Sequence, residues 1–582
     1  MNQSLRFVLA VVLMVAVVVL TNILFPTGRR TGPAVADSVT ATPAQQAKPP
    51  AAAPAPTAPQ PGALAPAPAT PPTITADTVI VESPLYRFGF STQGAALVSA
   101  EMLGFKSYTR DGPVQLAGRT PGGLVSHNLR VDSQVVELDA LPFAPSARAV
   151  RLDEGSGAQE LRFTHNSVEH GSIVVTYRFL PDNYLVHVDV QARTRTAPNR
   201  LHLEIGPTLA INEARAVEDE RALAYVVNSS DRGIENMPLR SLKERRIEEG
   251  PLEWVALKNK YFVAAAVVDT TTGARPFGGL IADDVPARYA ADLTATLPPR
   301  ADGGFGYRLY LGPQEYDRLV GVGNKLQDVN PMGWRVFRPI LRPLSEIITW
   351  ALLTIHRALD ISYGWVLIIF GVLIRLAMWP LNAKAMRSQL KSMELQPRLK
   401  DIQTRYKNEP EKLQKEMLRL YKEEGFNPMG GCLPMLIPMP VLITLFFVFQ
   451  NFIEFRGVPF LWLPDLSRAD PYYILPIVLG ATIFVQQLIS MKTMPPNPQM
   501  KFMMYFMPLF MVVIFLNLAS GLNLYYAAQN LPGFIQQMQL TKERARYQKE
   551  RGLMPAAAPT PPPAAPKSPP SSTTGGKKSR KR

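Results

Sequence analysis

The chain has 582 residues, of which 47% are hydrophobic and 19% are charged. At roughly 150 residues per domain, this length gives room for three or four units and excludes a single small module. The charged fraction lies below the roughly 25% of soluble globular proteins, which indicates that part of the chain lies in lipid. The single cysteine, Cys432, excludes an internal disulfide, a cysteine-rich zinc site and a CxxC redox pair.

The net charge of +15 is concentrated in two segments. Residues 375–428 hold 12 basic and 7 acidic side chains, and residues 541–582 hold 11 basic and 2 acidic ones. Both segments flank long apolar runs, and basic residues collect on the cytoplasmic side of membrane proteins. The charge therefore predicts a cytoplasmic loop and a basic cytoplasmic tail. Either could also contact anionic lipid or ribosomal RNA, and we expect no DNA partner.

The N-terminus carries an apolar run at residues 8–25, behind Arg6. This run is longer than the apolar core of a signal peptide, and no small-residue cleavage site follows it. We expect residues 1–26 to form an uncleaved anchor with a cytoplasmic N-terminus, and a signal peptide is the alternative. Residues 27–78 include 11 Pro and 12 Ala between positions 41 and 72, which predicts a disordered linker.

Residues 79–330 are predicted to form a large all-β sandwich outside the cytoplasm. Apolar and polar residues alternate at 172–179, 185–190 and 201–205, and turn residues such as 181–183 separate these runs. Many short strands without helical patterns between them are typical of a sandwich. The segment contains His127, His165, His170, His187 and His202. No metal-binding spacing such as HExxH occurs, so ordinary strand and loop histidines are favoured.

Past the sandwich the pattern becomes helical. Residues 331–358 mix charged and apolar side chains, which favours an amphipathic helix at the membrane interface. Residues 359–540 are expected to form a five-span core. Its apolar runs lie at residues 361–380, 433–450, 472–490 and 501–540, and the last is long enough for two spans with a reversal near residues 517–521. With the anchor this gives six spans and places both termini in the cytoplasm.

The segment 382–428 is predicted to form a cytoplasmic helical hairpin. Met386, Leu390 and Met393 recur at helical spacing, as do Leu413, Met417 and Leu420, and a break at residues 408–410 separates the two groups. Two interpretations stay open. The hairpin is either a plain solvated structure or a docking surface for a ribosome or a targeting receptor.

Arg375 lies inside the apolar run 365–379. A charge at mid-bilayer costs at least about 2.5–3.5 kcal/mol. The five apolar runs after the sandwich contain no Asp or Glu, so Arg375 needs water or polar side chains as partners. The candidates are Gln450, Asn517, Asn523, Gln529, Asn530 and Gln536. Together they predict a wet, positively charged groove within the membrane, and snorkelling of Arg375 to the cytoplasmic surface is the alternative.

The missing intramembrane acids disfavour a proton- or cation-coupled transporter. A shallow cationic groove suits transient binding of a polar or acidic segment, while neighbouring helices rich in Met and aromatic residues guide an apolar segment into lipid. A solute transporter remains one alternative. Another is a membrane-anchored envelope enzyme that acts on sugars, which needs a paired-carboxylate or histidine-centred site that the sequence does not reveal.

A series of motifs accompanies Arg375: residues 427–434, 439–440, 470–476, 520–522 and 524–526. With the large β domain before Arg375, they resemble the YidC/Oxa family of membrane-protein insertases, in particular its Gram-negative members. The resemblance covers essentially the whole chain. It implies an insertase and chaperone of the bacterial inner membrane, not an enzyme, without nucleotide, metal or other cofactor. It also implies that the β sandwich is a periplasmic domain.

The resemblance also implies roles for single residues. Arg375 would be the groove arginine, and Tyr526 would be the aromatic substrate contact on the last span. Met439 and Leu442 would be apolar substrate contacts on the second core span. The implied partners are nascent membrane proteins, the Sec translocon, the lipid bilayer and the ribosome, the last through the hairpin and the basic tail.

Overall fold

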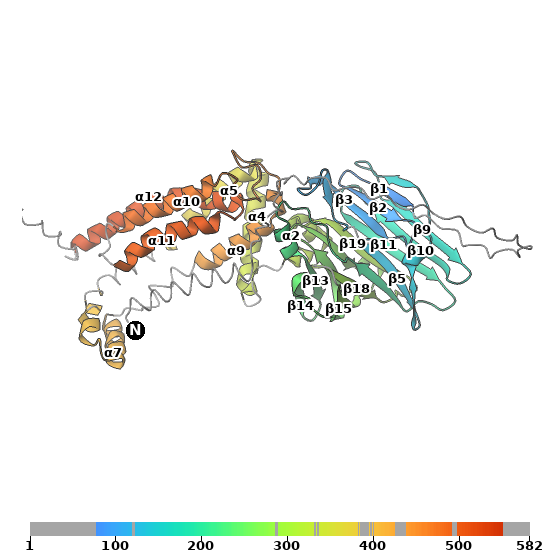
Figure 1. Cartoon of the computed structure of the whole chain (residues 1–582), viewed down its shortest axis with the longest axis horizontal. Coiled ribbons are helices and arrows are strands. Elements are labelled where there is room, and N and C mark those ends of the chain that lie inside the picture. Colours follow the sequence, from blue (N-terminus) through green and yellow to red (C-terminus); the bar gives the residue numbers. More distant parts are fainter. Residues whose placement is uncertain are drawn as a thin grey trace, which may run out of the picture. The chain divides into compact units, whose positions relative to one another are not determined.

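A computed structural model describes residues 77–118, 123–285, 289–330, 333, 337–381, 383, 395, 398–399, 401–424, 438–491 and 498–550. The predicted anchor, nearly all of the linker, most of the first half of the hairpin and the tail beyond residue 550 lie outside these residues. The chain divides into two units, Met1–Val329 and Asn330–Arg582. Each is described by itself (Figure 1).

The first unit is built from β-strands with two short helices, α2 (Ala216–Ala222) and α3 (Tyr316–Val322). Its strands are β1 (Thr78–Glu82), β2 (Tyr86–Ser91), β3 (Leu97–Lys106), β4 (Pro113–Gln115), β5 (Val125–Val131), β6 (Gln134–Glu137), β7 (Ala144–Pro145), β8 (Ala149–Arg151), β9 (Gln159–Ser167), β10 (Gly171–Phe179), β11 (Leu185–Arg193), β12 (Arg200–Ile205), β13 (Ala224–Ser229), β14 (Gly233–Pro238), β15 (Arg246–Lys258), β16 (Phe262–Val268), β17 (Phe277–Asp284), β18 (Ala291–Leu297) and β19 (Phe305–Pro313).

The period-two pattern of the sequence explains which side of each strand is buried. In β10, Ile173, Val175 and Tyr177 are buried, whereas the residues between them are only partly covered. β10 pairs antiparallel with β9 and with β11, as expected for neighbouring strands joined by short turns. The predicted all-β domain is confirmed.

Two runs of paired strands share the long strand β15. Its C-terminal half pairs with β13 and β16, and its N-terminal half pairs with β17. One run continues through β19, β11, β10 and β9, and the other continues through β18, β12, β5, β3, β2 and β1. Large rings fill the space between the runs, since Phe90 of β2 lies 4.5 Å from Tyr177 of β10 between ring centroids. This is the packing of a sandwich.

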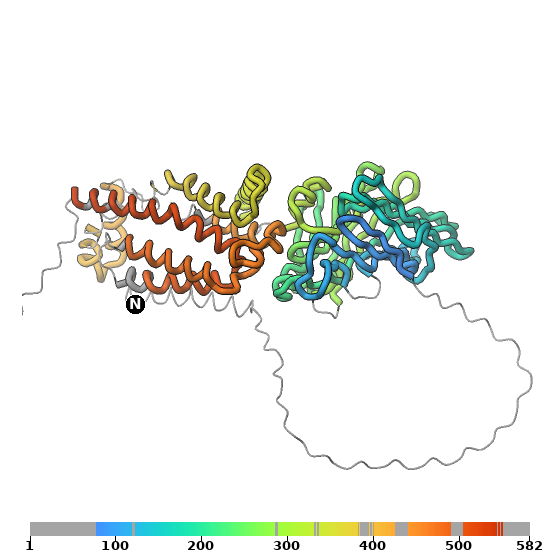
Figure 2. Tube along the Cα trace, turned by 90° about the horizontal axis from the view of Figure 1, so that it is seen from above, coloured from blue at the N-terminus to red at the C-terminus, as the bar shows by residue number. Residues whose placement is uncertain are grey.

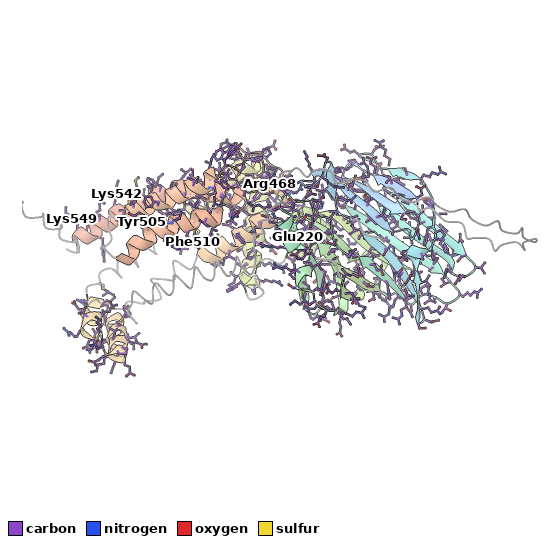
Figure 3. All side chains as sticks on the ribbon, viewed as in Figure 1. Glu220, Arg468, Tyr505, Phe510, Lys542 and Lys549 are labelled. Carbon is purple, nitrogen blue, oxygen red and sulfur yellow. The ribbon has the colours of Figure 1, made fainter. Side chains whose placement is uncertain are left out.

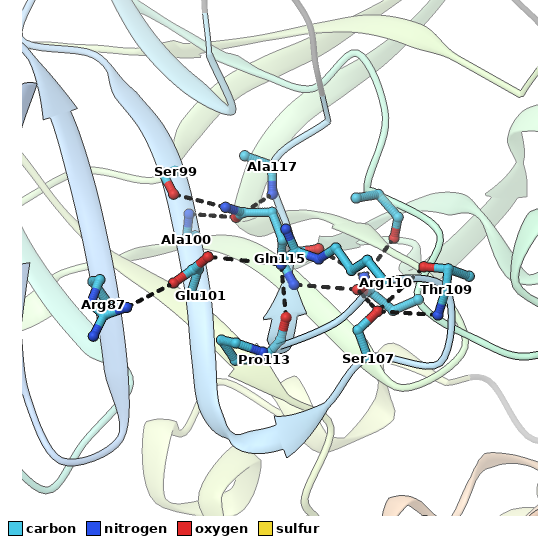
Figure 4. A network of polar contacts seen from close by, with 12 residues as sticks. Arg87, Ser99, Ala100, Glu101, Ser107, Thr109, Arg110, Pro113, Gln115 and Ala117 are labelled. Atoms are coloured by element: carbon cyan, nitrogen blue, oxygen red, sulfur yellow. Dashed lines mark hydrogen bonds and ion pairs between the residues drawn. The ribbon is translucent and has the colours of Figure 1, made fainter.

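Side-chain hydrogen bonds stabilise the short strand β4. Gln115 at the end of β4 accepts hydrogen bonds from the backbone N–H groups of Ala100 (2.7 Å) and Ala117 (3.2 Å). Its amide nitrogen donates to Ser99 Oγ at 2.7 Å (Figure 4). These three contacts join Gln115 to β3 and to the residues just after β4, so they stabilise the pairing of β3 with β4.

The second unit is helical. Its helices are α4 (Arg338–Leu359), α5 (Tyr363–Ala377), α7 (Pro410–Glu423), α9 (Pro438–Asn451), α10 (Ile474–Met491), α11 (Pro498–Phe515) and α12 (Ser520–Glu550). α5 packs along α12, α10 packs on both α11 and α12, and α4 packs on α9 and α5. Figures 1 and 2 show α10, α11 and α12, coloured orange to red, running side by side. The helical C-terminal region expected after the sandwich is therefore confirmed.

By length and composition, one helix among the described residues could cross a membrane, Tyr363–Leu381. Shorter apolar helices lie at Pro440–Asn451, Ile474–Ile489 and Met504–Phe515. The predicted reversal near residues 517–521 falls between the end of α11 at Phe515 and the start of α12 at Ser520. α12 differs from the expectation because it continues past residue 540 to Glu550. Residues 541–550 are polar but contain no Gly or Pro, so the helix outlasts its apolar part.

Candidate functional site

The structure places Arg375 in the last turn of α5, half-buried against α12. A methyl group added at Gly533 of α12 would lie 2.9 Å from Nη2 and 3.1 Å from Cζ of Arg375. The guanidinium therefore lies directly on the backbone of α12, at a position where any side chain would collide with it.

The two helices run in the same direction. Leu367 of α5 lies beside Gly521, Gly371 lies beside Tyr525, and Arg375 lies beside Gly533. A methyl group at Gly371 would lie 2.9 Å from the carbonyl oxygen of Tyr525, so this crossing also depends on a glycine. Small residues let helix backbones approach closely, and they are common where membrane helices pack.

Several polar atoms around this helix pair have no hydrogen-bond partner within the described part of the chain. They are Nε of Arg375, Oδ1 of Asn523, the hydroxyl of Tyr526, and both polar atoms of the Gln536 side chain, and all of them are buried. We call these four residues the polar stripe. A buried donor or acceptor without a partner costs about 1–3 kcal/mol, so native proteins rarely keep such groups without a use.

Helix geometry aligns the members of the polar stripe. Two members, Tyr526 and Gln536, lie seven residues before and three residues after Gly533, which places them on the face of α12 that carries Gly533. At 1.5 Å per residue, Gln536 lies about 4.5 Å and Tyr526 about 10 Å along the axis from the level of Arg375. The stripe therefore extends along α12 on both sides of the guanidinium.

The neighbouring polar residues of α12 have other roles. Tyr525 is buried, with its ring 5.8 Å from Phe370 of α5 and 5.7 Å from Phe449 of α9 between centroids. Asn530 donates from Nδ2 to Thr482 Oγ1 of α10 at 3.0 Å. These residues join α12 to its neighbours.

The other residues predicted for the site are spread over the bundle. Gln529 is half-buried on α12 about 6 Å along the axis from the level of Arg375. Gln450 is half-buried in the last turn of α9. Asn517 is exposed in the α11–α12 turn, 16 residues before Gly533. α12 begins at Ser520, and the 13 positions from there to Gly533 span about 20 Å of helix, so the structure does not bring Asn517 to the guanidinium.

The predicted apolar contacts lie on α9. Leu442 is 40% exposed. Met439 is in the first turn of α9, and its side chain lies outside the described residues. The outward faces of the bundle are apolar, as on α11, where Tyr505, Leu509 and Val513 recur every four residues and are more than half exposed. Figure 3 shows side chains projecting from α11, with Tyr505 and Phe510 labelled. Such faces fit lipid.

The histidines of the β unit form ordinary structural contacts. His127 is fully buried with Nε2 2.8 Å from the hydroxyl of Tyr307, and burial lowers the pKa of His127 to about 4. His187 Nδ1 lies 3.1 Å from Asp269 Oδ2, and His165 Nδ1 lies 2.8 Å from the carbonyl oxygen of Pro142. Within the described ranges, no group of three His, Cys, Asp or Glu side chains is placed to hold a metal ion.

Sequence reasoning missed Gly533. It did name Gln536, but only as one of several polar candidates. The available signal was the Pro532–Gly533 pair inside an apolar helix, because a glycine at such a position often marks close approach of another group. Which group approaches depends on the pairing of α5 with α12, and the sequence alone does not give that pairing.

Two family models match consecutive parts of the chain. The YidC periplasmic domain matches residues 78–347, and the 60Kd inner membrane protein matches residues 354–549. The membrane protein insertase YidC of Chlorobium phaeovibrioides (strain DSM 265 / 1930) is 34% identical over 492 residues, which are 79% of this chain and 83% of the relative. The chain belongs to the YidC family of membrane protein insertases.

Other members of the family are similarly related. The membrane protein insertase YidC of Chlorobaculum tepidum is 30% identical over 511 residues, which are 84% of this chain and 85% of that protein. A crystal structure of an active YidC insertase is 17% identical and covers 80% of this chain and 92% of its own, with a TM-score of 0.32. Family membership follows from the sequence relatives.

Proposed function

We propose that the chain inserts membrane proteins into the bacterial inner membrane and assists their folding, with the polar stripe as the binding site for the polar part of the substrate. The observation that carries this proposal is the position of the Arg375 guanidinium on Gly533 of α12, the helix that also carries the unpartnered polar atoms of Tyr526 and Gln536. A polar segment bound there would supply the missing hydrogen bonds and opposite charge.

The mechanism needs no catalytic residue. An acidic or polar segment that must cross the bilayer loses hydration, which costs several kcal/mol for a charged group. The polar stripe lowers that cost for as long as the segment stays bound. The apolar segment that follows moves along the exposed faces of α9 and α11 into lipid, with Met439 and Leu442 as its contacts, and burial of its apolar surface favours the final state.

We further propose which side chains of the groove contact the substrate. In this proposal Arg375, Tyr526 and Gln529 contact one substrate segment, with Asn523 further along α12 and Gln450 on α9 as additional contacts. Asn517 precedes α12, so its proposed role is limited to contacts at the end of the groove where α12 begins.

The proposed partners follow from location and charge. Nascent membrane proteins are the substrates, alone for small ones and beside the Sec translocon for larger ones. The hairpin at residues 382–428 and the basic tail at 541–582 lie on the cytoplasmic side and contact the ribosome. In this arrangement the protein is multi-pass with both termini in the cytoplasm, because that orientation places every strongly basic loop inside.

A reconstitution experiment tests the proposal. A small single-span substrate with a short acidic outer segment is added to liposomes with or without the purified protein, and protease protection of the outer segment is measured. Protection that requires the protein and no ATP supports autonomous insertion. A second substrate, with the acidic residues replaced by their amides, shows whether charge contributes. No gain over empty liposomes contradicts insertion without further components.

A further inference from the structure

The segment that joins α9 to α10, residues 452–473, presents apolar side chains to its surroundings. Leu461 is 71% exposed, Trp462 37%, Tyr472 66% and Tyr473 50%. Trp365, in the first turn of α5, is 52% exposed, and its ring stands edge-on to Phe460 at 5.3 Å between centroids. We call Trp365, Leu461, Trp462, Tyr472 and Tyr473 the apolar rim.

Two of the three acidic side chains of this segment, Asp465 and Asp470, are buried, and the third, Glu454, is half-buried. Asp465 is 3% exposed and accepts hydrogen bonds from the backbone N–H and the hydroxyl of Ser467, both at 2.8 Å. Asp470 is 1% exposed and accepts from the N–H groups of Tyr472 at 3.0 Å and Leu475 at 2.8 Å. Arg468 is the exposed charged residue of residues 452–473 (Figure 3). The exposed surface of the segment is therefore mainly apolar, with Arg468 as its exposed charged side chain and Glu454 partly covered.

The tip of the segment is held in a conformation that favours exposure of Leu461. The N–H of Phe460 donates to the carbonyl of Leu463 at 2.8 Å, and the reverse bond is 2.9 Å, which closes a two-residue turn. Leu461 in this turn has φ of 53°. That left-handed conformation costs a leucine about 1–2 kcal/mol, so the surrounding hydrogen bonds must impose it.

The rim is fixed to the ends of three helices. The N–H of Ser520 donates to the carbonyl of Arg468 at 2.6 Å, and the N–H of Gly521 donates to that of Leu466 at 2.8 Å. Phe460 packs so closely on Gly364 that a methyl group there would collide with its ring. The rim therefore lies at the level where α5, α10 and α12 begin.

We propose that the apolar rim is a lipid-binding surface that inserts into the headgroup region of one leaflet, the periplasmic one in the topology above. Trp and Tyr favour this region because their rings enter the apolar boundary while the indole N–H and the phenol hydroxyl remain hydrated. Arg468 is suited to the lipid phosphates. The rim is also continuous with the apolar outer face of α10, where Ile474 is 40% and Ile477 58% exposed.

Such anchoring sets the depth of the polar stripe. Arg375 follows Trp365 by ten residues on the same helix, which is about 15 Å along the axis. The hydrocarbon core is about 30 Å thick, so a rim at its boundary places the guanidinium near the middle of the bilayer. The lipid-binding surface itself is separate from the polar stripe and does not depend on insertase activity.

Spin labelling tests the proposal in the full-length chain. Cys432→Ser removes the native thiol, and Leu461→Cys then carries a nitroxide in vesicles of phosphatidylethanolamine and phosphatidylglycerol. Collision with oxygen and with a water-soluble nickel chelate reports the depth of the label. The controls are Val168→Cys, which is 88% exposed in the β9–β10 turn, and Leu509→Cys, which is 65% exposed on α11.

The expected nickel collision rate at position 461 is several-fold lower than at position 168, with a depth shallower than at position 509. A nickel rate equal to that at position 168 would place the rim in water and overturn the proposal. A label shielded from both reagents would mean that protein covers the rim, which also overturns it. Tyr472→Cys, on a different part of the rim, should give the same interfacial depth, which guards against local misfolding in the Leu461→Cys variant.

Discussion

The guanidinium of Arg375 and the backbone of Gly533 are in direct contact, with only 2.9 Å between Nη2 and a methyl group placed at Gly533. This contact holds the positive charge on the surface of α12 rather than in the space between helices. It also places the charge about 4.5 Å along the helix axis from Gln536, whose side-chain atoms are unpartnered in the described part of the chain. Gly533 therefore sets where the charge of the polar stripe lies.

Gly533→Ala should displace the Arg375 side chain without unfolding the bundle, because the far end of a flexible side chain can move. The charged hydrogen bonds that Arg375 would make with a substrate should weaken, and insertion of the acidic substrate should fall by up to about tenfold, the equivalent of about 1.4 kcal/mol. Protease protection in liposomes measures this. Leu531→Ala, at a position 69% exposed on the same helix, is the control and should insert normally. Normal insertion by Gly533→Ala would show that the contact is unimportant.

Arg375→Ala should impair the acidic substrate by roughly tenfold or more, because a hydrogen bond to a charged group is worth about 1.5–3 kcal/mol. Arg375→Lys should retain most of the activity, since attraction to an acidic segment requires the charge more than the shape of the guanidinium. Both variants are compared in the same protection assay. If the lysine variant failed as completely as the alanine variant, electrostatic attraction would be the wrong explanation.

Hydropathy and alternation predicted the architecture because they reflect local rules. The strands β10, β11 and β12 lie where the alternating runs predicted strands, and α5 and α10 follow the apolar runs. Hydropathy was less informative for the ends of helices. α12 continues ten residues beyond residue 540. The apolar run ends there, but the polar residues that follow still favour a helix.

The site was only partly predictable for a different reason. An arginine in an apolar run is visible in any sequence, so Arg375 could be named. Its neighbours depend on which helices pack together and in which direction, and the α5–α12 pairing joins residues more than 150 positions apart. Asn517 was grouped with Arg375 on polarity alone, whereas it precedes α12, whose first residue lies about 20 Å of helix before Gly533.

The close crossing of α5 and α12 predicts a stability effect. In Gly371→Ala, the new methyl group would lie 2.9 Å from the carbonyl oxygen of Tyr525, which is backbone and cannot turn aside. Overpacking of this kind costs about 1–3 kcal/mol, and alanine recovers about 0.5–1 kcal/mol of it through helix propensity. We expect a lower midpoint for thermal unfolding of the helical unit in detergent.

A glycine with free space around it provides the comparison for Gly371. Gly321 of α3 has no atom within 4 Å of an added methyl group, so Gly321→Ala should stabilise the β unit slightly. An unchanged midpoint for Gly371→Ala would mean that the two helices separate easily, and the close packing of Arg375 on Gly533 would then also be adjustable.

The burial of His127 makes the stability of the β unit depend on pH. Burial lowers the pKa of His127 to about 4 in the folded chain, against about 6.5 in an unfolded one. Between these values the unfolded state binds the extra proton, so the free energy of unfolding decreases as the pH falls from 6.5 to 4. Above pH 6.5 the free energy of unfolding is higher by about 3 kcal/mol than below pH 4, as far as the titration of His127 is concerned.

His127→Gln should remove this pH dependence of the free energy of unfolding, because glutamine does not titrate in this range. Its side-chain amide can still form a hydrogen bond with the Tyr307 hydroxyl. Denaturant unfolding of the full chain, followed by the β-sheet signal at pH 7 and pH 4.5, gives the difference between wild type and variant. Tyr307→Phe is the matched control. It removes the hydrogen bond but leaves His127 buried, so it should keep the wild-type pH dependence. An equal loss of pH dependence in both variants would assign the effect to the hydrogen bond instead of to burial.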